Sequence, residues 1–300
     1  MNNQDHISIG ISFYNSAEYL SYAIKSIIKQ THDKWELILI DDGSSDNSLE
    51  IAKSFEKIDK RIRVLSDGQN KKLPYRLNQI IDESSYNYIA RMDADDIMHP
   101  ERLSRQIKFL KENPDYDLVS TGLISIDNKN IVYGYRGDKV SNDEFFNKVQ
   151  LYYPINHATV LARKSWFVRN RYNLNYPRAQ DYELWCRASS NSDLRAYIMP
   201  DLLYYYREEG LVTADKMIGS YEASLTAYNY YSGSFNIPTY IKVNLKKNII
   251  KILDKTSLLQ YLARFRNKQA PNPLIIKKHQ EIVNYIIYDS DINIPWNRIR

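Results

Sequence analysis

The sequence predicts an α/β fold in which a mostly parallel central sheet is flanked by helices and followed by a C-terminal α-helical appendage. In the first hundred residues, short runs rich in β-branched residues alternate with segments of helical periodicity, which is typical of βα units around a parallel sheet. After Gly210 the pattern changes to helices rich in tyrosine, isoleucine and lysine. A chain of 300 residues is long enough for one large α/β domain with such an appendage, or for two modest domains.

Four strands and two helices are expected in the first hundred residues. The strands are predicted at residues 7–12, 35–40, 61–65 and 88–92. A helix over residues 17–29 has its leucine and isoleucines at helical spacing, and a second helix over residues 45–56 has Asp46 near its start as a capping residue. Because the carboxyl ends of parallel strands meet at one edge of a sheet, the loops after these strands are expected to form the ligand crevice.

The next hundred residues are less regular. Pro100 begins a helix that ends at Asn113 and Pro114, and a strand at residues 159–162 and a helix at residues 181–189 follow. We therefore expect residues 1–100 and 101–210 to form two halves of one domain. Residues 211–300 are expected to form the helical C-terminal region.

Composition is that of an ordinary globular protein. The single cysteine, Cys186, excludes an intramolecular disulfide and a thiolate metal cluster, which fits a reducing, cytoplasmic location. The first residues lack the pattern of an export signal, and no stretch reaches the roughly 18 uncharged apolar residues that a membrane span needs. The net charge of +5 is concentrated after residue 240, and acidic motifs elsewhere argue against an extended nucleic-acid groove.

The most specific motif is Ala90-Arg91-Met92-Asp93-Ala94-Asp95-Asp96, in which three carboxylates follow an apolar strand. Such a cluster repels itself unless a cation neutralises it, and hard divalent cations prefer oxygen ligands. A cation held by one or two carboxylates also leaves positions for substrate phosphates. The alternative is an acidic solvated turn in which Asp96 caps a helix.

Two further loops follow the first two predicted strands. In Asp41-Asp42-Gly43-Ser44-Ser45 a carboxylate stands where it can accept a hydrogen bond from a nucleobase imide, and the glycine allows the backbone to approach a ligand closely. A plain turn followed by a helix cap remains the alternative. The loop Ser12-Phe13-Tyr14-Asn15 offers a hydroxyl, an aromatic face and an amide at the same edge.

Together these motifs resemble the family 2 glycosyltransferases, which have the GT-A fold. The resemblance rests on ISFYNSAEYLSYAIKSIIKQT, WELILIDDGSSDNS, YIARMDADDIMHPERLSRQ and RAQDYELWCR, in this order, and covers roughly residues 6–210. It implies that residues 1–100 bind a nucleotide sugar and that residues 101–210 bind the acceptor.

The resemblance also implies roles for the donor-side residues. Asp42 would bind the uracil edge of a UDP-sugar, with Ser12 and Tyr14 beside it. Asp93 would face the ribose or the metal, and Asp95 would ligate Mn²⁺ or Mg²⁺ that bridges the diphosphate.

Asp181, within Gln-Asp-Tyr-Glu-Leu-Trp, matches the catalytic base of the family. It would accept the proton of the acceptor hydroxyl as the oxygen attacks opposite the leaving diphosphate, and this single displacement inverts the anomeric configuration. The family commonly has Glu-Asp here, so Gln180 is a departure that leaves the base in place. Without the resemblance, Asp181 is a helix N-cap.

Four residues have weaker assignments. His157 matches a recurrent family histidine and is predicted on the acceptor side together with Trp185, although a lone histidine is more often structural. Arg207 and Lys72 lie where related enzymes present basic residues to the donor, and a solvated loop is the alternative for Lys72.

The sequence therefore predicts an inverting, metal-dependent glycosyltransferase with a saccharide or undecaprenyl-diphosphate-linked acceptor. A nucleotidyltransferase is one alternative, but it would show a glycine-rich basic loop after the first strand, where SFYNSAEY has neither glycine nor lysine. A non-catalytic sugar-binding or scaffold subunit is the other, and the four retained carboxylates argue against it. The sugar, the acceptor and the linkage are not predicted.

The segment 241–254 predicts an amphipathic helix. One face gathers Ile241, Leu245, Ile249, Ile252 and Leu253, and four lysines spread around the remainder. Such a helix either lies on an anionic membrane surface, which would make the protein peripheral on the inner face of the cell membrane, or packs its apolar face on the catalytic domain.

Overall fold

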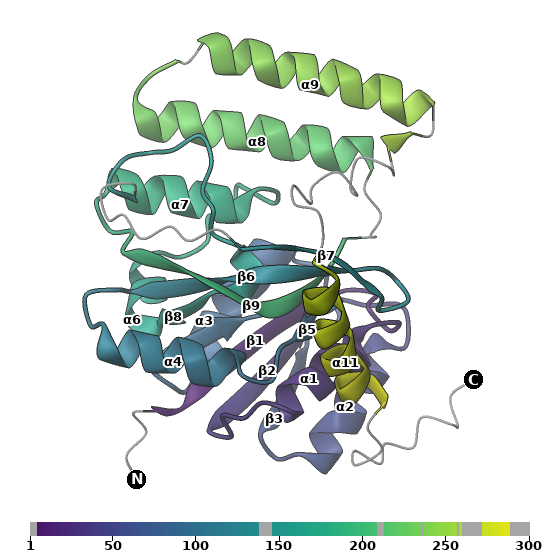
Figure 1. Cartoon of the computed structure of the whole chain (residues 1–300). Helices are drawn as coiled ribbons and strands as arrows, with labels where there is room; N and C mark the ends of the chain where they lie inside the picture. Colours follow the sequence, from purple (N-terminus) through teal and green to yellow (C-terminus); the bar gives the residue numbers. More distant parts are fainter. Residues whose placement is uncertain are drawn as a thin grey trace.

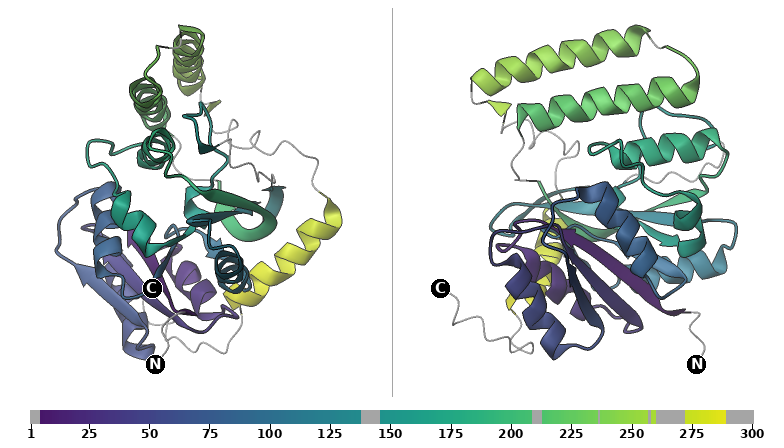
Figure 2. Two further views of the ribbon diagram at one scale, coloured as in Figure 1. Left: turned by 90° about the vertical axis from the view of Figure 1, so that its left-hand side faces the viewer. Right: turned by 180° about the vertical axis from the view of Figure 1, so that it is seen from behind.

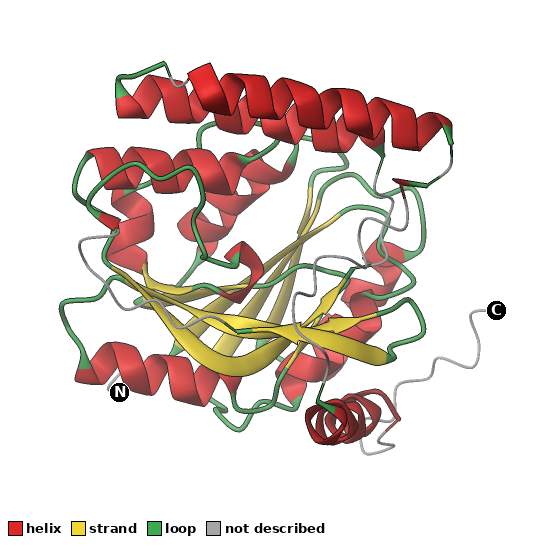
Figure 3. Ribbon diagram, turned by 45° about the horizontal axis from the view of Figure 1, so that its top comes forward, coloured by secondary structure: helices red, strands yellow, loops and turns green. Residues whose placement is uncertain are grey.

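The computed structural model describes residues 5–137, 146–208, 213–235, 237–256, 258–259 and 272–288. A curled central sheet lies between helices (Figures 1 and 3). Its strands are β1 (Ile7–Phe13), β2 (Trp35–Asp41), β3 (Ile62–Ser66), β4 (Tyr88–Arg91), β5 (Ile97–Met98), β6 (Leu118–Ile126), β7 (Val132–Arg136), β8 (Leu161–Arg163) and β9 (Ala196–Arg207). The helices are α1 (Leu20–Ile28), α2 (Ser48–Ile58), α3 (Leu73–Glu83), α4 (Arg102–Glu112), α6 (Lys164–Arg169), α7 (Gln180–Ser190), α8 (Ala214–Ser232), α9 (Ile237–Lys255) and α11 (Pro273–Tyr288), with a 3₁₀ turn, η2 (His157–Thr159).

The strand order is β3-β2-β1-β4-β8-β6-β9-β5, and β7 pairs with β6. Parallel pairing joins β1 to β2 and β4, β2 to β3, and β6 to β9. The strands β5, β7 and β8 run antiparallel to their neighbours. The α/β prediction is confirmed, and the parallel pairing dominates the first half, whereas the second half makes the whole sheet mixed.

Burial on both faces explains the apolar strands. The strands β1 and β2 are almost wholly buried, as expected for parallel strands covered by helices on both sides. One face packs against α1, α2 and α4, and the other packs against α3, α6 and α7. Gly10 of β1 allows α3 to lie close, because a β-carbon there would stand 2.2 Å from Cγ2 of Ile80.

The predicted elements of the first hundred residues are present, and α7 lies where a helix is predicted. The predicted strand at residues 159–162 is shorter and begins after η2. Six helices and strands of the described residues before Gly210 are absent from the sequence prediction, namely α3, β5, β6, β7, α6 and β9.

The helices of the C-terminal region form two separate groups (Figures 1 and 2). Helix α8 packs on α7, and α9 packs on α8, so that three helices are stacked. Helix α11 instead contacts α1 and β7, and Val283 and Ile286 join a buried cluster with Tyr205 of β9. Within the described residues, no helix has both the length and the apolar character needed to cross a membrane.

Candidate active site

An open cavity of about 450 Å³ lies where β4, η2, β7, β9 and α7 meet. Side chains from segments far apart in the sequence line it, among them Arg91, Asp93, Arg136, His157, Asp181 and Tyr206. The structure therefore brings together three of the residues predicted from the sequence, Asp93, His157 and Asp181.

Asp181 lies in the first turn of α7. Ala179, the residue before the helix, has a left-handed backbone with φ 52° and ψ 31°. The helix begins at the next residue, at the wall of the cavity. Burial raises the pKa of Asp181, while backbone hydrogen bonds and the charge of Arg91 act in the opposite direction. A carboxylate with a raised pKa is a stronger proton acceptor, which is the property that a general base requires.

Asp93 is held by Arg91 in a two-point contact. The guanidinium nitrogens Nη1 and Nη2 of Arg91 lie 3.0 and 2.5 Å from Oδ2 and Oδ1 of Asp93. The hydroxyl of Tyr204 accepts a hydrogen bond from the Asp93 amide at 3.1 Å. Both carboxylate oxygens are thereby oriented at the edge of the cavity. Sequence reasoning gave Arg91 no role, although it lies within the acidic motif two residues before its partner.

The other two carboxylates of the motif differ in environment. Asp95 is exposed, and a hydrogen bond from its own backbone favours the ionised form of its carboxylate. Enough protein still surrounds it that desolvation, together with the charge of Asp93, raises its pKa to about 6. Asp96 is buried, and its Oδ2 has no hydrogen-bond partner among the described residues. Burial, together with the charges of Asp95 and Asp93, raises the pKa of Asp96 well above its ordinary value. Asp95 is thus the most exposed carboxylate of the motif.

This donor set fits a hard divalent cation that takes most of its ligands from elsewhere. No group of three His, Cys, Asp or Glu side chains converges on a common point in the described part of the chain. A cation bound through Asp95, with its remaining positions filled by diphosphate oxygens and water, needs no such cage. Asp93 would be able to join as a ligand while it is bonded to Arg91, because each of its oxygens has a second lone pair beside the one that accepts from the guanidinium.

Arg207 supports the acidic loop from behind. Its backbone amide donates to Oδ1 of Asp96 at 2.7 Å, and its Nε donates to the carbonyl of Asp95 at 2.8 Å. The remaining guanidinium nitrogens bond the Asp127 carbonyl and the side chain of Asn130. The contacts of Arg207 are therefore with the acidic loop and with the turn between β6 and β7, and a contact with the donor stays a prediction.

Asp42 is enclosed by the loop that leads into α3. Its carboxylate accepts from the amides of Lys71 at 2.8 Å and Lys72 at 3.1 Å, and from Nε of Arg76 at 2.8 Å. Gly43 has φ +79°, and a β-carbon there would lie 2.9 Å from the carbonyl carbon of Gln69. The close approach that this glycine permits is thus made by the protein's own chain.

Ser12 and Tyr14 lie beside Asp42 at the end of β1, because β1 and β2 pair in register up to Phe13 and Asp41. Tyr14 is 51% exposed, so its ring is open to a ligand. Lys72 is exposed as well. Its backbone has φ 72° and ψ 158°, a conformation that residues other than glycine rarely adopt.

His157 and Trp185 differ in their relation to the cavity. His157 lines the cavity, and its Nε2 lies 2.7 Å from the hydroxyl of Tyr172. Burial lowers the pKa of His157 and the nearby Arg91 adds to this effect, so the ring is neutral. Trp185 is 2% exposed and packs edge-on against His157 from the core side. Trp185 therefore positions the histidine from below.

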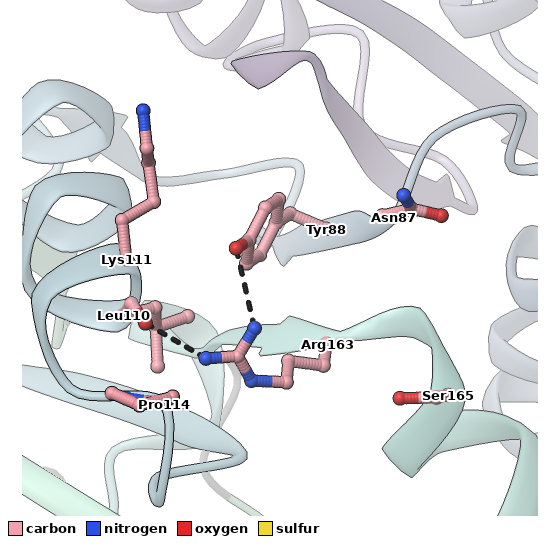
Figure 4. A pocket seen from close by; sticks show the side chains of 7 residues that line it. All are labelled: Asn87, Tyr88, Leu110, Lys111, Pro114, Arg163 and Ser165. Carbon is pink, nitrogen blue, oxygen red and sulfur yellow. Dashed lines mark hydrogen bonds between the residues drawn. The ribbon is translucent and has the colours of Figure 1, made fainter. Parts of the chain in front are cut away.

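A second cavity of about 450 Å³ lies at the start of β4 (Figure 4). Its arginine, Arg163, bonds the hydroxyl of Tyr88 and the carbonyls of Leu110 and Tyr116. None of the residues that line it is acidic, and the guanidinium is already engaged. This cavity lacks the groups that a transfer reaction needs.

Comparisons with known proteins identify the family of this chain. The model of the family described as "Glycosyl transferase family 2" matches residues 8–173. EpsE of Bacillus subtilis (strain 168), a glycosyltransferase by name, is 32% identical over 217 residues, which cover 70% of this chain and 75% of EpsE. The O-antigen biosynthesis glycosyltransferase WbnJ of Escherichia coli is 27% identical over 261 residues, which cover 83% of this chain and 94% of WbnJ.

Among solved structures, a mannosyltransferase from Pyrobaculum calidifontis in complex with GDP-Man and Mn²⁺ has a similar fold. The TM-score is 0.58 at 14% identity, over 94% of this chain and 84% of the other. The family match covers more than half of the chain, and the structural match is to a transferase with the same architecture. The chain therefore belongs to glycosyl transferase family 2 and is a glycosyltransferase with a GT-A-like fold.

Proposed function

We propose that this glycosyltransferase moves a sugar from a nucleotide sugar to a saccharide hydroxyl with inversion, and that Asp181 is the general base. The observation that carries the proposal is the shared cavity. Asp181 of α7 lies in one wall, and the Arg91–Asp93 pair at the end of β4 lies in another. A sugar between them would present its anomeric carbon to an acceptor on the Asp181 side and its diphosphate to the acidic loop.

The reaction balances as a single displacement. The acceptor oxygen forms a bond to the anomeric carbon while the bond between that carbon and the diphosphate oxygen breaks. Asp181 takes the hydroxyl proton, and the nucleoside diphosphate leaves with the electron pair. A divalent cation at Asp95, Mn²⁺ or Mg²⁺, would stabilise the charge on the departing diphosphate. The Mn²⁺ in the complex of the Pyrobaculum enzyme supports this choice.

We propose a uridine nucleotide as the donor, because Asp42, Ser12 and Tyr14 lie together at the edge of the sheet where the family resemblance predicts the base. The Pyrobaculum enzyme was crystallised with GDP-Man, so guanosine nucleotides are the rival donors to test. For the acceptor we propose a saccharide, free or carried on a polyprenyl diphosphate such as undecaprenyl diphosphate. The similarity to an O-antigen biosynthesis enzyme supports this class.

The test is a panel of UDP- and GDP-sugars given to the full chain with Mn²⁺, in which release of nucleoside diphosphate is measured. NMR of the product then gives its anomeric configuration. We expect Asp181→Asn to lose about 10²–10⁴ in rate. Asp82→Asn, which changes an exposed carboxylate paired with Arg171, is the matched control and should keep wild-type activity.

Four results would contradict the proposal. Retention of configuration would exclude the single displacement, and wild-type turnover by Asp181→Asn would exclude this base. Donor binding without turnover across a broad acceptor panel would favour a sugar-binding subunit. Turnover of a nucleoside triphosphate with a sugar phosphate would favour a nucleotidyltransferase.

A further inference from the structure

The side of α9 that faces away from α8 carries a row of exposed apolar side chains, which we call the α9 stripe. Its members are Ile237, Ile241, Leu245, Ile249 and Ile252, each between 54% and 62% exposed. They recur at intervals of four, four, four and three residues, so they share one face of the helix.

A different face of α9 holds it on the protein. Ile250 is 3% exposed and packs with Leu253 against Met217 and Tyr221 of α8. The sequence prediction grouped Leu253 with the apolar face, whereas in the structure this residue belongs to the packing face. Because Ile250 and Leu253 hold α9 on α8, the residues of the α9 stripe are not needed to attach the helix to the rest of the protein.

Lysines border the α9 stripe. By helical spacing, Lys242 lies on one flank, and Lys251 and Lys255 lie on the other. All three are exposed, and none forms an ion pair with a described residue. Lys247, in contrast, lies towards α8 and pairs with Glu222 at 2.5 Å. An apolar stripe between rows of free cations is the pattern of a helix that lies in the interface of an anionic membrane.

The lysines beside the α9 stripe also indicate which kind of partner covers it. A second copy of the chain placed on the same stripe would bring lysine rows face to face, which is unfavourable. An anionic lipid surface offers acyl chains to the isoleucines and negative headgroups to the lysines. We propose that the α9 stripe docks on an anionic lipid surface, as the cytoplasmic leaflet of a membrane provides.

The stacked helices connect this surface to the active site. The hydroxyl of Tyr231 in α8 donates to Glu183 of α7 at 2.7 Å, two residues from Asp181. Packed helix axes are about 8–10 Å apart, so α9 lies about 20 Å from the axis of α7. Docking would bring the cavity near a lipid-carried acceptor. The delivery of an acceptor rests on the proposed function, whereas the binding of the α9 stripe to lipid does not.

The experiment is co-sedimentation of the full chain with phosphatidylcholine vesicles, with and without phosphatidylglycerol. We expect binding to the anionic vesicles alone, weakened by salt. The stripe variant Ile241→Ser/Leu245→Ser/Ile249→Ser should lose this binding. The lysine variant Lys242→Gln/Lys251→Gln/Lys255→Gln should lose about fivefold in affinity for each lysine.

Matched controls change equally exposed residues outside α9. Ile58→Ser/Leu174→Ser alters side chains that are 55% and 57% exposed, and Lys53→Gln/Lys57→Gln/Lys60→Gln removes three exposed charges. Both controls should bind vesicles like the wild type. Donor hydrolysis in solution should be unchanged in every variant, so a failure of docking is distinguishable from a failure of the proposed function.

Several outcomes would overturn the proposal. Equal binding to neutral and anionic vesicles, or binding to neither, would exclude an anionic lipid surface. Unchanged binding by the stripe variant would place the contact elsewhere. A concentration-dependent dimer that only the stripe variant abolishes, without vesicle binding, would show that a second copy covers the stripe.

Discussion

Arg76, whose side chain is fully buried, donates a hydrogen bond from Nε to the Asp42 carboxylate at 2.8 Å. The same guanidinium bonds Asp67 at 2.6 Å and the Gln69 carbonyl. Arg76 of α3 therefore fixes both the Asp42 carboxylate and the loop that covers it. The predicted nucleotide-binding edge depends on a residue that lies outside all four sequence motifs.

Arg76→Met should destabilise the protein and weaken donor binding. Removing one partner of a buried pair leaves an uncompensated charge, which costs about 3–5 kcal/mol. Urea unfolding and the KM for the donor measure the two effects. Arg171→Met, which breaks the exposed pair with Asp82, is the control and should cost less than about 1 kcal/mol. Similar losses in the two variants would contradict the role of Arg76.

The contrast between Asp181 and Arg76 shows what the sequence can predict. Asp181 lies within a spaced motif, and its helix follows the predicted pattern. Arg76 lies on α3, where Leu77, Ile80 and Ile81 have helical spacing and Pro74 in the first turn marks a helix start, so the helix itself was within reach of the sequence pattern. The role of Arg76 comes from contacts with residues 34 and 9 positions away, and no local pattern encodes them.

The second half of the sheet was unpredictable for a related reason. The strand β6 is buried at all nine positions, so it lacks the alternation that marks a half-exposed strand. The strand β9 contains Pro200 and shifts register against β6, which interrupts its pattern. Arg136, which lines the cavity from β7, was missed because its strand was missed.

Asp95→Asn should lose most turnover while the protein remains folded. Asp95 is exposed and its carboxylate accepts a hydrogen bond from its own backbone, which an asparagine oxygen can also accept, so the substitution preserves the local fold. Activity of the wild type should disappear in excess chelator and return with Mn²⁺ or Mg²⁺. Thiol labelling reports folding, because Cys186 is buried and its pKa is raised to about 12 by that burial. Full activity in chelator would contradict the metal requirement.

Asp181→Asn should be at least as stable as the wild type although it is inactive. Burial raises the pKa of Asp181, so the folded state disfavours the ionised form, and stability is lost as pH rises from about 3.9 through the raised pKa. Asparagine removes this penalty. For the same reason, the acid limb of the kcat/KM profile should lie above the usual range of an aspartate. Thermal unfolding and a pH–rate profile test the two statements, and an acid limb near pH 4 would contradict the second.

Acid should loosen the contact between α11 and the sheet. His279 of α11 lies 3.1 Å from the hydroxyl of Tyr205 and packs edge-on against His99. Burial lowers the pKa of each histidine to about 4, and for His279 the charge of His99 adds to the effect. Since the unfolded chain binds these protons near pH 6.5, stability should fall as pH drops from about 6.5 to about 4.

The variant His279→Phe tests this acid effect. It should show a smaller slope of unfolding free energy against pH over that window, whatever its stability at neutral pH. Urea unfolding at a series of pH values measures the slope. Parallel slopes in the variant and the wild type would show that other groups dominate the acid response.

The last prediction separates the backbone of Lys72 from its amine. Lys72 has φ 72° and ψ 158°, and the Asp42 carboxylate holds it there by accepting its amide. Such a conformation costs about 1–3 kcal/mol in a residue other than glycine. Lys72→Gly relieves this strain but gains chain entropy when unfolded, worth about 0.4–1 kcal/mol. Lys72→Ala keeps the strain and removes the same amine. We therefore expect Lys72→Gly to be more stable than Lys72→Ala by about 1 kcal/mol.

If the amine contacts the donor, both variants should raise the donor KM to the same extent, because both lack the amine. Equal stability of the two variants would mean that the strain does not exceed the entropy effect of about 0.4–1 kcal/mol. An unchanged KM in both would leave Lys72 as a solvated loop residue.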